Sequence, residues 1–384
     1  MSRTIIVSNR LPIKISNLDK SFEFSSTSGG LATGMKSIHK KNNFLWIGWP
    51  GIDKKSLGNN LAKAEKLLHK KNYIPVFLRK KEINDFYYGT SNEALWPLFH
   101  YFLEFSIFNK SHWKSYVNVN KKFAKSVIKY ANKGDIVWVH DYQLLLCPRM
   151  IKTKRPDLTV GFFLHIPFPS FEIFRIFPWR EELLEGILGS DLIGFHTYDY
   201  VRHFLSSVKR ILRYDVIFNK INVGSREVLV DTFPMGIDYA KYNDAARKKN
   251  EQKKSEMSNI RLQLMDHKKT SFDSKLILSI DRLDYTKGVI NRIKAFEIFL
   301  TNNPEYRGKV RLIMLTVPSR SDVDDYIKLK KQTDEIVGRV NGKFASVNWT
   351  PIWYYYRSMS FDELIDLYTI SDIAMITPVR DGMN

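Results

Sequence analysis

The sequence has very little cysteine and no long apolar run, and each shortage excludes a class of protein. A single cysteine, Cys147, excludes an intramolecular disulfide framework and any zinc site built on cysteines. No window approaches the roughly 18 consecutive apolar residues of a membrane span. The opening residues, Met1–Ser8, are too short and too polar for a signal peptide, and they have the pattern of a first strand. We therefore expect a cytoplasmic, globular protein.

Charge of one sign is in excess. The chain has 60 Lys and Arg against 40 Asp and Glu, which gives a net charge of +20. Such an excess suits nucleic acid, a membrane surface or anionic substrates. The basic residues come mostly as scattered pairs, and the densest stretch, Arg247–Lys254, lies in a polar helical pattern with Glu251. Without a recognisable nucleic-acid module, we interpret most of the excess as solvated surface lysine, and we expect neither nucleic acid nor a membrane as a partner.

The apolar pattern indicates an α/β protein. Hydrophobic residues make up 44% of the chain, which excludes a disordered polypeptide. Periods typical of amphipathic helices cover residues 57–69 and 289–300. Short apolar runs typical of buried parallel strands lie at Thr4–Ser8, Phe44–Gly48, Ile74–Leu78, Asp135–His140, Val160–His165, Leu192–Phe195, Val228–Phe233, Leu276–Ile280, Val310–Thr316 and Ile373–Thr377. This alternation predicts parallel sheets covered by helices on both faces.

A change of pattern near residues 234–275 marks a domain boundary. The length of 384 residues already suggests two domains or three. Pro234–Asp238 has the composition of a turn, and a long polar helical stretch without a strand follows it. We therefore predict a first domain at 1–236 and a second at 237–384. Ligands of open α/β sheets bind beyond the carboxyl ends of the strands, so the residues that follow each strand are the candidates for binding.

Two segments near the first strand are candidates for anion binding. Arg10 follows this strand directly. A later turn that contains Gly29 and Gly30 begins an apparent helix, where backbone N–H groups can approach an anion. The turn does not match the G-x-G-x-x-G dinucleotide fingerprint, and taken alone it fits an ordinary glycine-rich turn better.

Histidine and aspartate close the next strands of the first domain. Asp141 is a candidate for binding a polar ligand, whereas a structural role is the favoured interpretation of His140. His165 closes the following strand before a proline-rich loop, and two successive strands with such ends strengthen each other. His196 ends a further strand, where packing is the favoured interpretation.

In the second domain, basic residues follow the strands. Arg282 and Lys287 flank an expected helix start, where a diphosphate would meet cations and N–H groups together. The alternative is a capped helix with solvated charges, with Thr286 or Asp284 as the cap. Arg320 follows the next strand. Asp322–Asp324 has the D-x-D form of metal-dependent sugar transferases, but acidic residues after a serine suit a helix N-terminus, and we reject the metal motif.

Taken together, these segments closely resemble the trehalose-6-phosphate synthases, the retaining glycosyltransferases of family 20. The matching segments run in family order over essentially the whole chain: 7–10, 28–32, 46–49, Tyr87–Tyr88, Asn92, 95–97, 140–142, 162–169, 282–288, 319–323, 338–342 and 377–384. The resemblance implies a GT-B fold, in which two Rossmann-like domains face a cleft. The acceptor would lie mainly on the N-terminal side and the nucleotide sugar mainly on the C-terminal side.

The resemblance also implies a reaction and a set of site residues. UDP-glucose and glucose 6-phosphate would give trehalose 6-phosphate and UDP, without a cofactor or a metal. By matching position, the acceptor phosphate would be held by Arg10, Tyr88, Trp96 and Arg320, and the acceptor sugar by Trp46 and Asp141. The donor would meet Gly29, Gly30, His165, Arg282, Lys287, Asp381, Gly382, Met383 and Asn384. The groups expected to serve the chemistry are His165, Asp141, Arg282, Lys287 and Asp381.

The expected mechanism needs no paired carboxylates. Arg282 and Lys287 would stabilise the negative charge that grows on the departing UDP, in place of a metal. The sequence shows no paired-carboxylate signature of a double-displacement glycosidase. We adopt the front-face mechanism of the family as a hypothesis, in which the departing phosphate helps to take the proton from the attacking hydroxyl.

Several alternatives stay open at this point. Family members continue past Asp-Gly-Met-Asn with a donor-binding Lys-Glu pair and further helices and strands, so we expect the second domain to be incomplete. One alternative is a glucosylglycerol-phosphate synthase of the same family, which uses glycerol 3-phosphate. Another is a truncated homologue that is inactive or regulatory. The nucleotide of the donor and the assembly into a homo-oligomer are not decided by the sequence.

Overall fold

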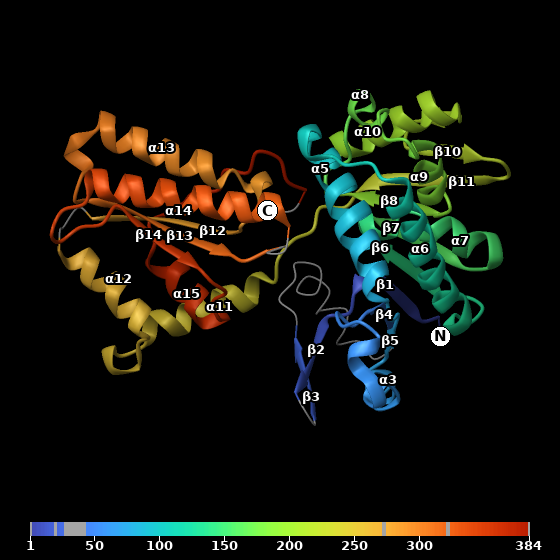
Figure 1. The fold of residues 1–384 in the computed structure, drawn as a ribbon, viewed down its shortest axis with the longest axis horizontal. Coiled ribbons are helices and arrows are strands. Elements are labelled where there is room, and N and C mark those ends of the chain that lie inside the picture. The colour runs from blue at the N-terminus through green and yellow to red at the C-terminus, as the bar shows by residue number, and fades with distance from the viewer. Residues whose placement is uncertain (1, 19–20, 27–43, 271–273, 320–322, 383–384) are drawn as a thin grey trace. The chain divides into compact units, whose positions relative to one another are not determined.

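The chain folds into two compact units, one from residue 1 to 236 and one from 237 to 382. The computed structural model describes residues 2–18, 21–26, 44–270, 274–319 and 323–382 (Figure 1). Both units are α/β with largely parallel sheets, which confirms the predicted fold class. In the described part of the chain, no helix is long and apolar enough to cross a membrane.

The first unit contains one large sheet with the strand order β5-β4-β1-β6-β7-β8-β11-β10-β9. All neighbours from β5 to β11 pair in parallel, and β10 pairs antiparallel with both β11 and β9. The strands are β1 (Thr4–Arg10), β4 (Phe44–Trp49), β5 (Tyr73–Pro75), β6 (Ile136–His140), β7 (Thr159–Phe163), β8 (Leu192–Phe195), β9 (Val216–Ile217), β10 (Lys220–Val223) and β11 (Arg226–Thr232). The centre of β1 is fully buried, as expected for a parallel strand with both faces covered.

Helices of the first unit connect these parallel strands. They are α3 (Leu61–His69), α4 (Lys80–Glu82), α5 (Trp96–Phe99), α6 (Lys110–Tyr130), α7 (Cys147–Lys154), α8 (Phe171–Phe174), α9 (Arg180–Ile187) and α10 (Tyr198–Ser207), together with the π-helical segments η2 (Ile83–Leu95) and η5 (Val208–Leu212) and the short turns η1 (Lys55–Asn60), η3 (Leu103–Phe105) and η4 (Tyr142–Leu144). An expected helix at 57–69 is thus split, because its first residues form the turn η1. The hairpin β2 (Ile13–Leu18) and β3 (Ser21–Ser26) forms a separate two-stranded sheet (Figure 1), which the sequence analysis did not predict.

The second unit contains a four-stranded parallel sheet with the order β14-β13-β12-β15. Its strands are β12 (Lys275–Arg282), β13 (Val310–Val317), β14 (Ile352–Tyr356) and β15 (Ile373–Ala374). Its helices are α11 (Tyr239–Glu251), α12 (Asn259–Thr270), α13 (Val289–Asn302), α14 (Asp324–Phe344) and α15 (Phe361–Ile370), with the turns η6 (Lys254–Glu256), η7 (Tyr285–Lys287) and η8 (Pro304–Tyr306). The strand β14 was not predicted, and β15 is shorter than the expected 373–377.

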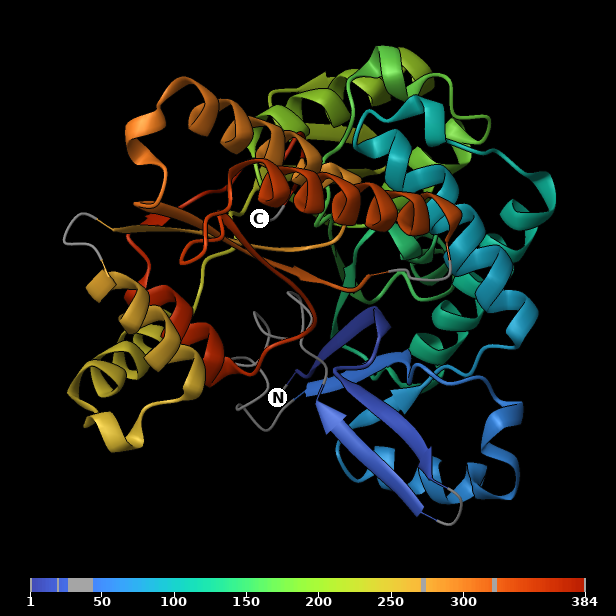
Figure 2. The same cartoon turned by 60° about the vertical axis from the view of Figure 1, so that its left-hand side comes forward.

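Two apolar layers enclose the second sheet. Helices α13 and α14 cover one face (Figure 2). On this face Ile293 and Val337 pack in the same cluster as Leu312. Helices α12 and α15 cover the other face, where Leu264 and Leu367 belong to a second cluster. The expected helix over 289–300 is therefore present, and its predicted apolar stripe is the buried one.

A buried carboxylate joins three helices of the second unit. Asp366 on α15 is fully buried and accepts a hydrogen bond of 2.7 Å from the Ser258 hydroxyl, which lies just before α12. It also pairs with Lys249 of α11 at 3.2 Å and with Arg261 of α12 at 3.4 Å. Two cations and a hydroxyl thus compensate one buried negative charge.

Replacing Asp366 with alanine should destabilise the second unit by about 3–5 kcal/mol, because the buried cations lose their counter-charge. Urea unfolding followed by circular dichroism measures the change. The matched control is D244A, which removes an exposed carboxylate from α11 and should shift stability by less than about 0.5 kcal/mol. Equal effects of the two substitutions would show that the Asp366 cluster contributes nothing specific.

Candidate active site

The carboxyl ends of β6, β7 and β8 bring three polar segments to one edge of the first sheet. Val139 of β6 pairs with Phe162 of β7, and Phe163 pairs with Gly194 of β8. Parallel strands in this register end together, so Asp141, His165 and His196 follow their strands at the same edge. The structure therefore brings together two residues that the sequence predicted as site residues, Asp141 and His165.

Three buried imidazoles form a row along this edge. The rings of His140 and His165 stack at 5.3 Å between centroids, and the rings of His165 and His196 lie 5.6 Å apart. His140 Nδ1 is 3.1 Å from His165 Nε2, which is hydrogen-bond distance. The row reaches one residue further at each side, because Trp138 packs on His140 and Phe163 packs on His196.

Burial holds the first two imidazoles of this row in the neutral form. It lowers the pKa of His140 to about 3. Burial also holds the pKa of His165 well below its ordinary value, with smaller contributions from His140 and His196. At neutral pH these side chains therefore act as hydrogen-bonding groups without charge. Neutral imidazoles suit the binding of sugar hydroxyls better than a role in which the ring must take up a proton and become charged.

The backbone at Asp141 is held in an unusual conformation. Its φ is 74° and its ψ is 169°, a combination that non-glycine residues rarely adopt and that clusters at functional sites. The Asp141 N–H donates to the Phe163 carbonyl at 2.8 Å, and its Oδ1 accepts from the His165 N–H at 3.3 Å. His140 therefore contacts the ring of His165, and the Asp141 carboxylate binds the backbone N–H of His165.

Helix α6 fixes the turn that follows Asp141. The buried Tyr116 hydroxyl donates to the Tyr142 carbonyl at 2.7 Å and accepts from the Leu145 N–H at 3.1 Å. Asn120 Nδ2 donates to the Gln143 carbonyl, and Asn120 Oδ1 accepts from the Leu146 N–H in the same turn. Burial raises the pKa of Tyr116 well above its ordinary value, so the hydroxyl keeps its proton. Four hydrogen bonds from one helix thus make the Asp141 turn rigid.

Four of the predicted acceptor residues lie on η2, α5, β1 and β4. The guanidinium of Arg10 lies 4.8 Å from the centroid of the Trp49 ring. Trp49 packs on Tyr87 at 6.2 Å, and Tyr87 packs on the predicted Tyr88 at 5.2 Å, so an aromatic chain links Arg10 to Tyr88. Gly51 makes room for this arginine, because a Cβ at that position would lie 2.1 Å from the guanidinium.

Trp46 and Trp96 are both buried. The Trp46 indole donates to the Ser8 hydroxyl at 2.8 Å, and only 1% of the residue is exposed. Trp96 packs on Tyr142, the residue after Asp141, with ring centroids 5.6 Å apart. Trp96 is thereby tied to the Asp141 turn, whereas Trp46 lies in the core next to β1. Their contacts with an acceptor stay predictions.

In the second unit, the predicted donor residues gather where β12 ends. Arg282 is exposed at the last position of β12, and Lys287 ends the turn η7. The Lys287 ammonium forms an ion pair with Asp381, and it lies 3.9 Å from Asp281. The 377–382 loop also binds η7 through its backbone, because the Val379 N–H donates to the Thr286 carbonyl at 2.8 Å. Gly382 follows Asp381 on this loop. Of the two predicted caps, Asp284 accepts from the Thr286 N–H at 3.1 Å.

Sequence reasoning missed two ionised residues of this cluster. Arg292 of α13 is buried and pairs with Asp281 at 2.8 Å. It also donates to Thr377 Oγ1 at 2.9 Å and to the Lys287 carbonyl at 3.1 Å. Burial raises the pKa of Asp281 although Arg292 and Lys287 oppose the shift. A signal was available, since Arg292 lies three residues after Val289 and four before Phe296, on the apolar face of its helix.

Some predicted residues lie outside the described part of the chain. They are Gly29, Gly30, Arg320, Met383 and Asn384. The remaining predicted residues are all placed: Asp141, His165, Arg10, Tyr88, Trp46 and Trp96 in the first unit, and Arg282, Lys287, Asp381 and Gly382 in the second. Asp324 is in the first turn of α14, as expected for a helix N-terminus.

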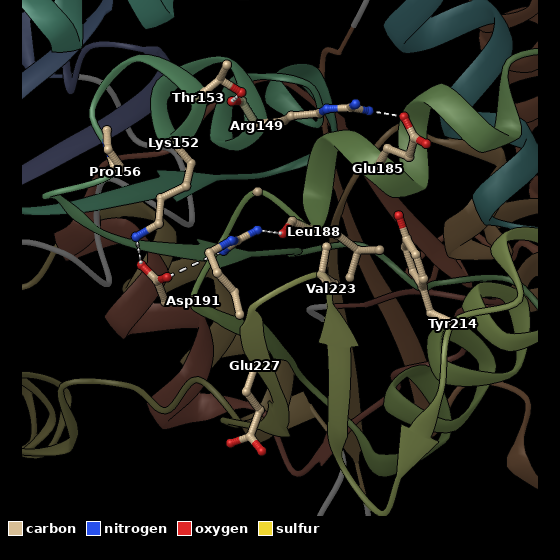
Figure 3. Close-up of a pocket in the computed structure, with 12 residues that line it drawn as sticks. Arg149, Lys152, Thr153, Pro156, Glu185, Leu188, Asp191, Tyr214, Val223 and Glu227 are labelled. Atoms are coloured by element: carbon tan, nitrogen blue, oxygen red, sulfur yellow. Dashed lines mark hydrogen bonds and ion pairs between the residues drawn. The ribbon is translucent and has the colours of Figure 1, made fainter.

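A cavity of about 610 Å³ lies at the opposite edge of the first sheet (Figure 3). Its lining residue Asp191 directly precedes β8, and Arg226 is the first residue of β11. Several charged groups there bind one another: Lys152 donates to Asp191 at 2.9 Å, Arg149 pairs with Glu185, and Arg226 pairs with Asp191 at 3.6 Å. These ion pairs indicate a structural role for the cavity, in which they hold α7, α9 and β11 together. The candidate active site is therefore the carboxyl edge of the sheet.

Comparisons with known proteins identify the family to which the chain belongs. The model described as glycosyltransferase family 20 matches residues 2–384. The UDP-forming α,α-trehalose-phosphate synthase of Candida albicans is 43% identical over 393 residues, which cover 100% of this chain and 79% of the relative.

Two solved structures are similar over the whole chain. A Burkholderia xenovorans synthase in complex with glucose 6-phosphate has a TM-score of 0.83 at 28% identity, and covers 100% of this chain and 80% of its own. An Escherichia coli trehalose-6-phosphate structure bound with UDP-2-fluoro glucose has a TM-score of 0.84 at 30% identity, with the same coverage. These likenesses confirm the predicted GT-B class.

The buried imidazoles predict an acid-sensitive first unit. In the folded chain the pKa of His140 is about 3, whereas unfolding returns it to about 6.5. Between these values only the unfolded state binds the proton, so stability is complete above about pH 6.5 and falls as the pH decreases, by up to about 1.4 kcal/mol per pH unit for each such histidine. Urea unfolding at about pH 7.5 and about pH 5, followed by tryptophan fluorescence, measures the loss.

The H140F variant should show a smaller loss of stability between the two pH values, because it removes one of the groups that the unfolded state protonates. The control is H203F, which replaces a half-buried histidine of α10 outside the row of buried imidazoles. A wild-type chain that is equally stable at both pH values would contradict the neutral, buried state of these side chains.

Proposed function

We propose, because the chain belongs to glycosyltransferase family 20, that it transfers glucose from UDP-glucose to glucose 6-phosphate with retention, giving trehalose 6-phosphate and UDP. The candidate active site supports this proposal through one observation above the others. Two cations, Arg282 at the end of β12 and Lys287 at the end of η7, lie between this strand and the start of α13, which is where a nucleotide diphosphate binds in open α/β folds. The Candida relative is a UDP-forming synthase, and the solved neighbours bind glucose 6-phosphate or a UDP-glucose analogue.

The donor side supplies charge stabilisation. As the bond between the glucose C1 and the phosphate oxygen breaks, negative charge grows on UDP, and Arg282 and Lys287 stabilise it. The acceptor hydroxyl forms the new bond on the same face of C1, and its proton goes to the departing phosphate oxygen. Asp381 and Gly382 contact the donor glucose from the loop that already binds η7. A diphosphate competes with Asp381 for the Lys287 ammonium.

The acceptor side supplies the phosphate and sugar contacts. Arg10, Tyr88 and Trp96 bind the phosphate of glucose 6-phosphate together with Arg320, and Trp46 and Asp141 contact the sugar. Gly29, Gly30, Met383 and Asn384 complete the donor contacts. The first domain, 1–236, serves mainly the acceptor and the second, 237–384, mainly the nucleotide sugar. A cytoplasmic location completes the proposal, and the buried thiol of Cys147 is compatible with a reducing compartment.

Substituting Arg282 by alanine should lower kcat by about 10²-fold or more, because a group aimed at developing charge acts mainly in the transition state. The KM for glucose 6-phosphate should change little. Steady-state UDP release at varied acceptor concentration separates the two constants. R247A removes the same charge from the exposed side of α11 and should behave like wild type. A rise in acceptor KM at unchanged kcat would remove Arg282 from the donor side.

Acceptor identity is decided by comparing two phosphates. With UDP-glucose as donor, we expect UDP release with glucose 6-phosphate and much less with glycerol 3-phosphate, because Trp46 and Asp141 suit a sugar ring. Product analysis by NMR should show two α-linked glucose units. The reverse preference would identify a glucosylglycerol-phosphate synthase. Release with neither acceptor would identify an inactive or regulatory homologue.

A further inference from the structure

We propose that His140 is a positioning residue, which holds the imidazole of His165 as the tautomer that carries its proton on Nδ1. The sequence alone favours a structural role for His140, and the structure gives this residue a more specific one. The effect on catalysis rests on the proposed function, because His165 is a donor-binding residue there. The tautomer itself follows from the geometry of the first unit alone.

The contact between the two rings is short and enclosed. His140 is the last residue of β6 and is fully buried, and His165 follows β7 with 6% of its surface exposed. His140 Nδ1 and His165 Nε2 are 3.1 Å apart, and the ring planes differ by only 26°. The Asp141 carboxylate accepts from the His165 N–H. Backbone and ring of His165 are therefore both fixed by the two residues at the end of β6.

Both rings are neutral at neutral pH, so each has one N–H and one unprotonated ring nitrogen. Only two arrangements of these protons make the hydrogen bond between the rings. In the first, His140 Nδ1 donates to His165 Nε2, so His165 keeps its proton on Nδ1. In the second, His165 Nε2 donates to His140 Nδ1, so His140 keeps its proton on Nε2. The arrangements differ in which residue is left with an N–H that lacks an acceptor.

The surroundings favour the first arrangement. Neither His140 Nε2 nor His165 Nδ1 has a hydrogen-bond partner among the residues that the structure describes. A buried N–H without an acceptor is costly, and it is costliest where no ligand can reach it. Both nitrogens are buried, but His165 lines a cavity of about 320 Å³ at the carboxyl edge of the sheet, whereas His140 is fully buried beneath Trp138 and is not among the residues that line this cavity. The unpaired N–H therefore belongs on His165, where a hydroxyl or phosphate oxygen of a bound sugar nucleotide can accept from it.

This arrangement gives His165 a definite chemical role. Its Nδ1–H is a neutral donor in a fixed orientation, and it cannot become a charged acid at physiological pH because burial resists protonation. Pre-orienting a donor removes the cost of ordering it when the substrate binds. His140 contributes through this orientation and touches no substrate itself.

The test uses two substitutions of His140 in the full chain. H140F keeps a planar ring but has no donor, and it should lower kcat for UDP release about tenfold, the effect of one lost hydrogen bond that acts on a catalytic group. H140N places an amide N–H near the former Nδ1, and it should recover most of this loss. The KM for glucose 6-phosphate should stay unchanged in both variants. H203F serves as the control for a histidine replaced elsewhere in the same unit.

Nitrogen-15 NMR of histidine-labelled protein reads the tautomer directly. The signal of His165, assigned by its loss in H165N, should show a protonated Nδ1 and an unprotonated Nε2 in wild type and H140N, and a mixture in H140F. A proton on Nε2 in wild type overturns the proposal, as does an H140F enzyme with wild-type kcat. If wild type releases no UDP, the proposed function fails while the NMR result still decides the tautomer.

A purely structural role for His140 predicts a different pattern. Both variants would then lower the fraction of folded enzyme, and kcat per folded molecule would stay constant. Thermal unfolding of each variant, with active-site concentration determined by UDP-glucose binding, separates this outcome from a loss of orientation. An H140N variant that folds like wild type but shows the kinetic loss of H140F would also overturn the proposal, because the restored donor should suffice.

Discussion

Parallel pairing of strands is the constraint on which the candidate active site depends. Backbone hydrogen bonds fix the register of β6, β7 and β8, and the register decides that the residues after these strands are neighbours. The contacts of Asp141 and His140 with His165 then follow from the sheet, because the three residues stand at the ends of adjacent strands. The same rule places Arg282 at the end of β12, close to the loop that follows β15.

Each unit solves the burial of polar groups at its site in a different way. The first unit keeps His140 and His165 neutral, so that their burial leaves no full charge to compensate. The second unit keeps charges and pairs them: Asp281 with Arg292, and Asp381 with Lys287. A neutral edge suits sugar hydroxyls, whereas paired ions can exchange one partner for an incoming phosphate. A nucleotide sugar and a sugar phosphate both present hydroxyl groups and phosphate groups, which suit the neutral edge and the paired ions respectively.

The sequence predicted the strands that are buried on both faces, because such strands are continuous apolar runs. It did not predict β2 and β3, in which apolar and polar residues are mixed and which, in the described part of the chain, form a two-stranded sheet of their own. It also missed β14, an edge strand in which Ile352 is followed by four aromatic residues. Asp141, His165, Arg282 and Lys287 could be chosen as candidates because they follow strands. Arg292 could not be chosen as a partner of Asp281, since the two residues are eleven positions apart on a strand and a helix, and only the fold shows that they meet.

The net charge of +20 has little to do with the candidate site. A cation inside a fold needs a carboxylate beside it, so each buried pair contributes nothing to the excess. Lys287, Arg292 and Arg261 all follow this rule, with Asp381, Asp281 and Asp366 as their partners. The buried Arg311 instead packs on an aromatic ring: it lies 3.9 Å from the Trp353 ring centroid, and burial lowers its pKa to about 10. The excess must therefore be carried by exposed residues, and it reports on the surface of the protein rather than on its chemistry.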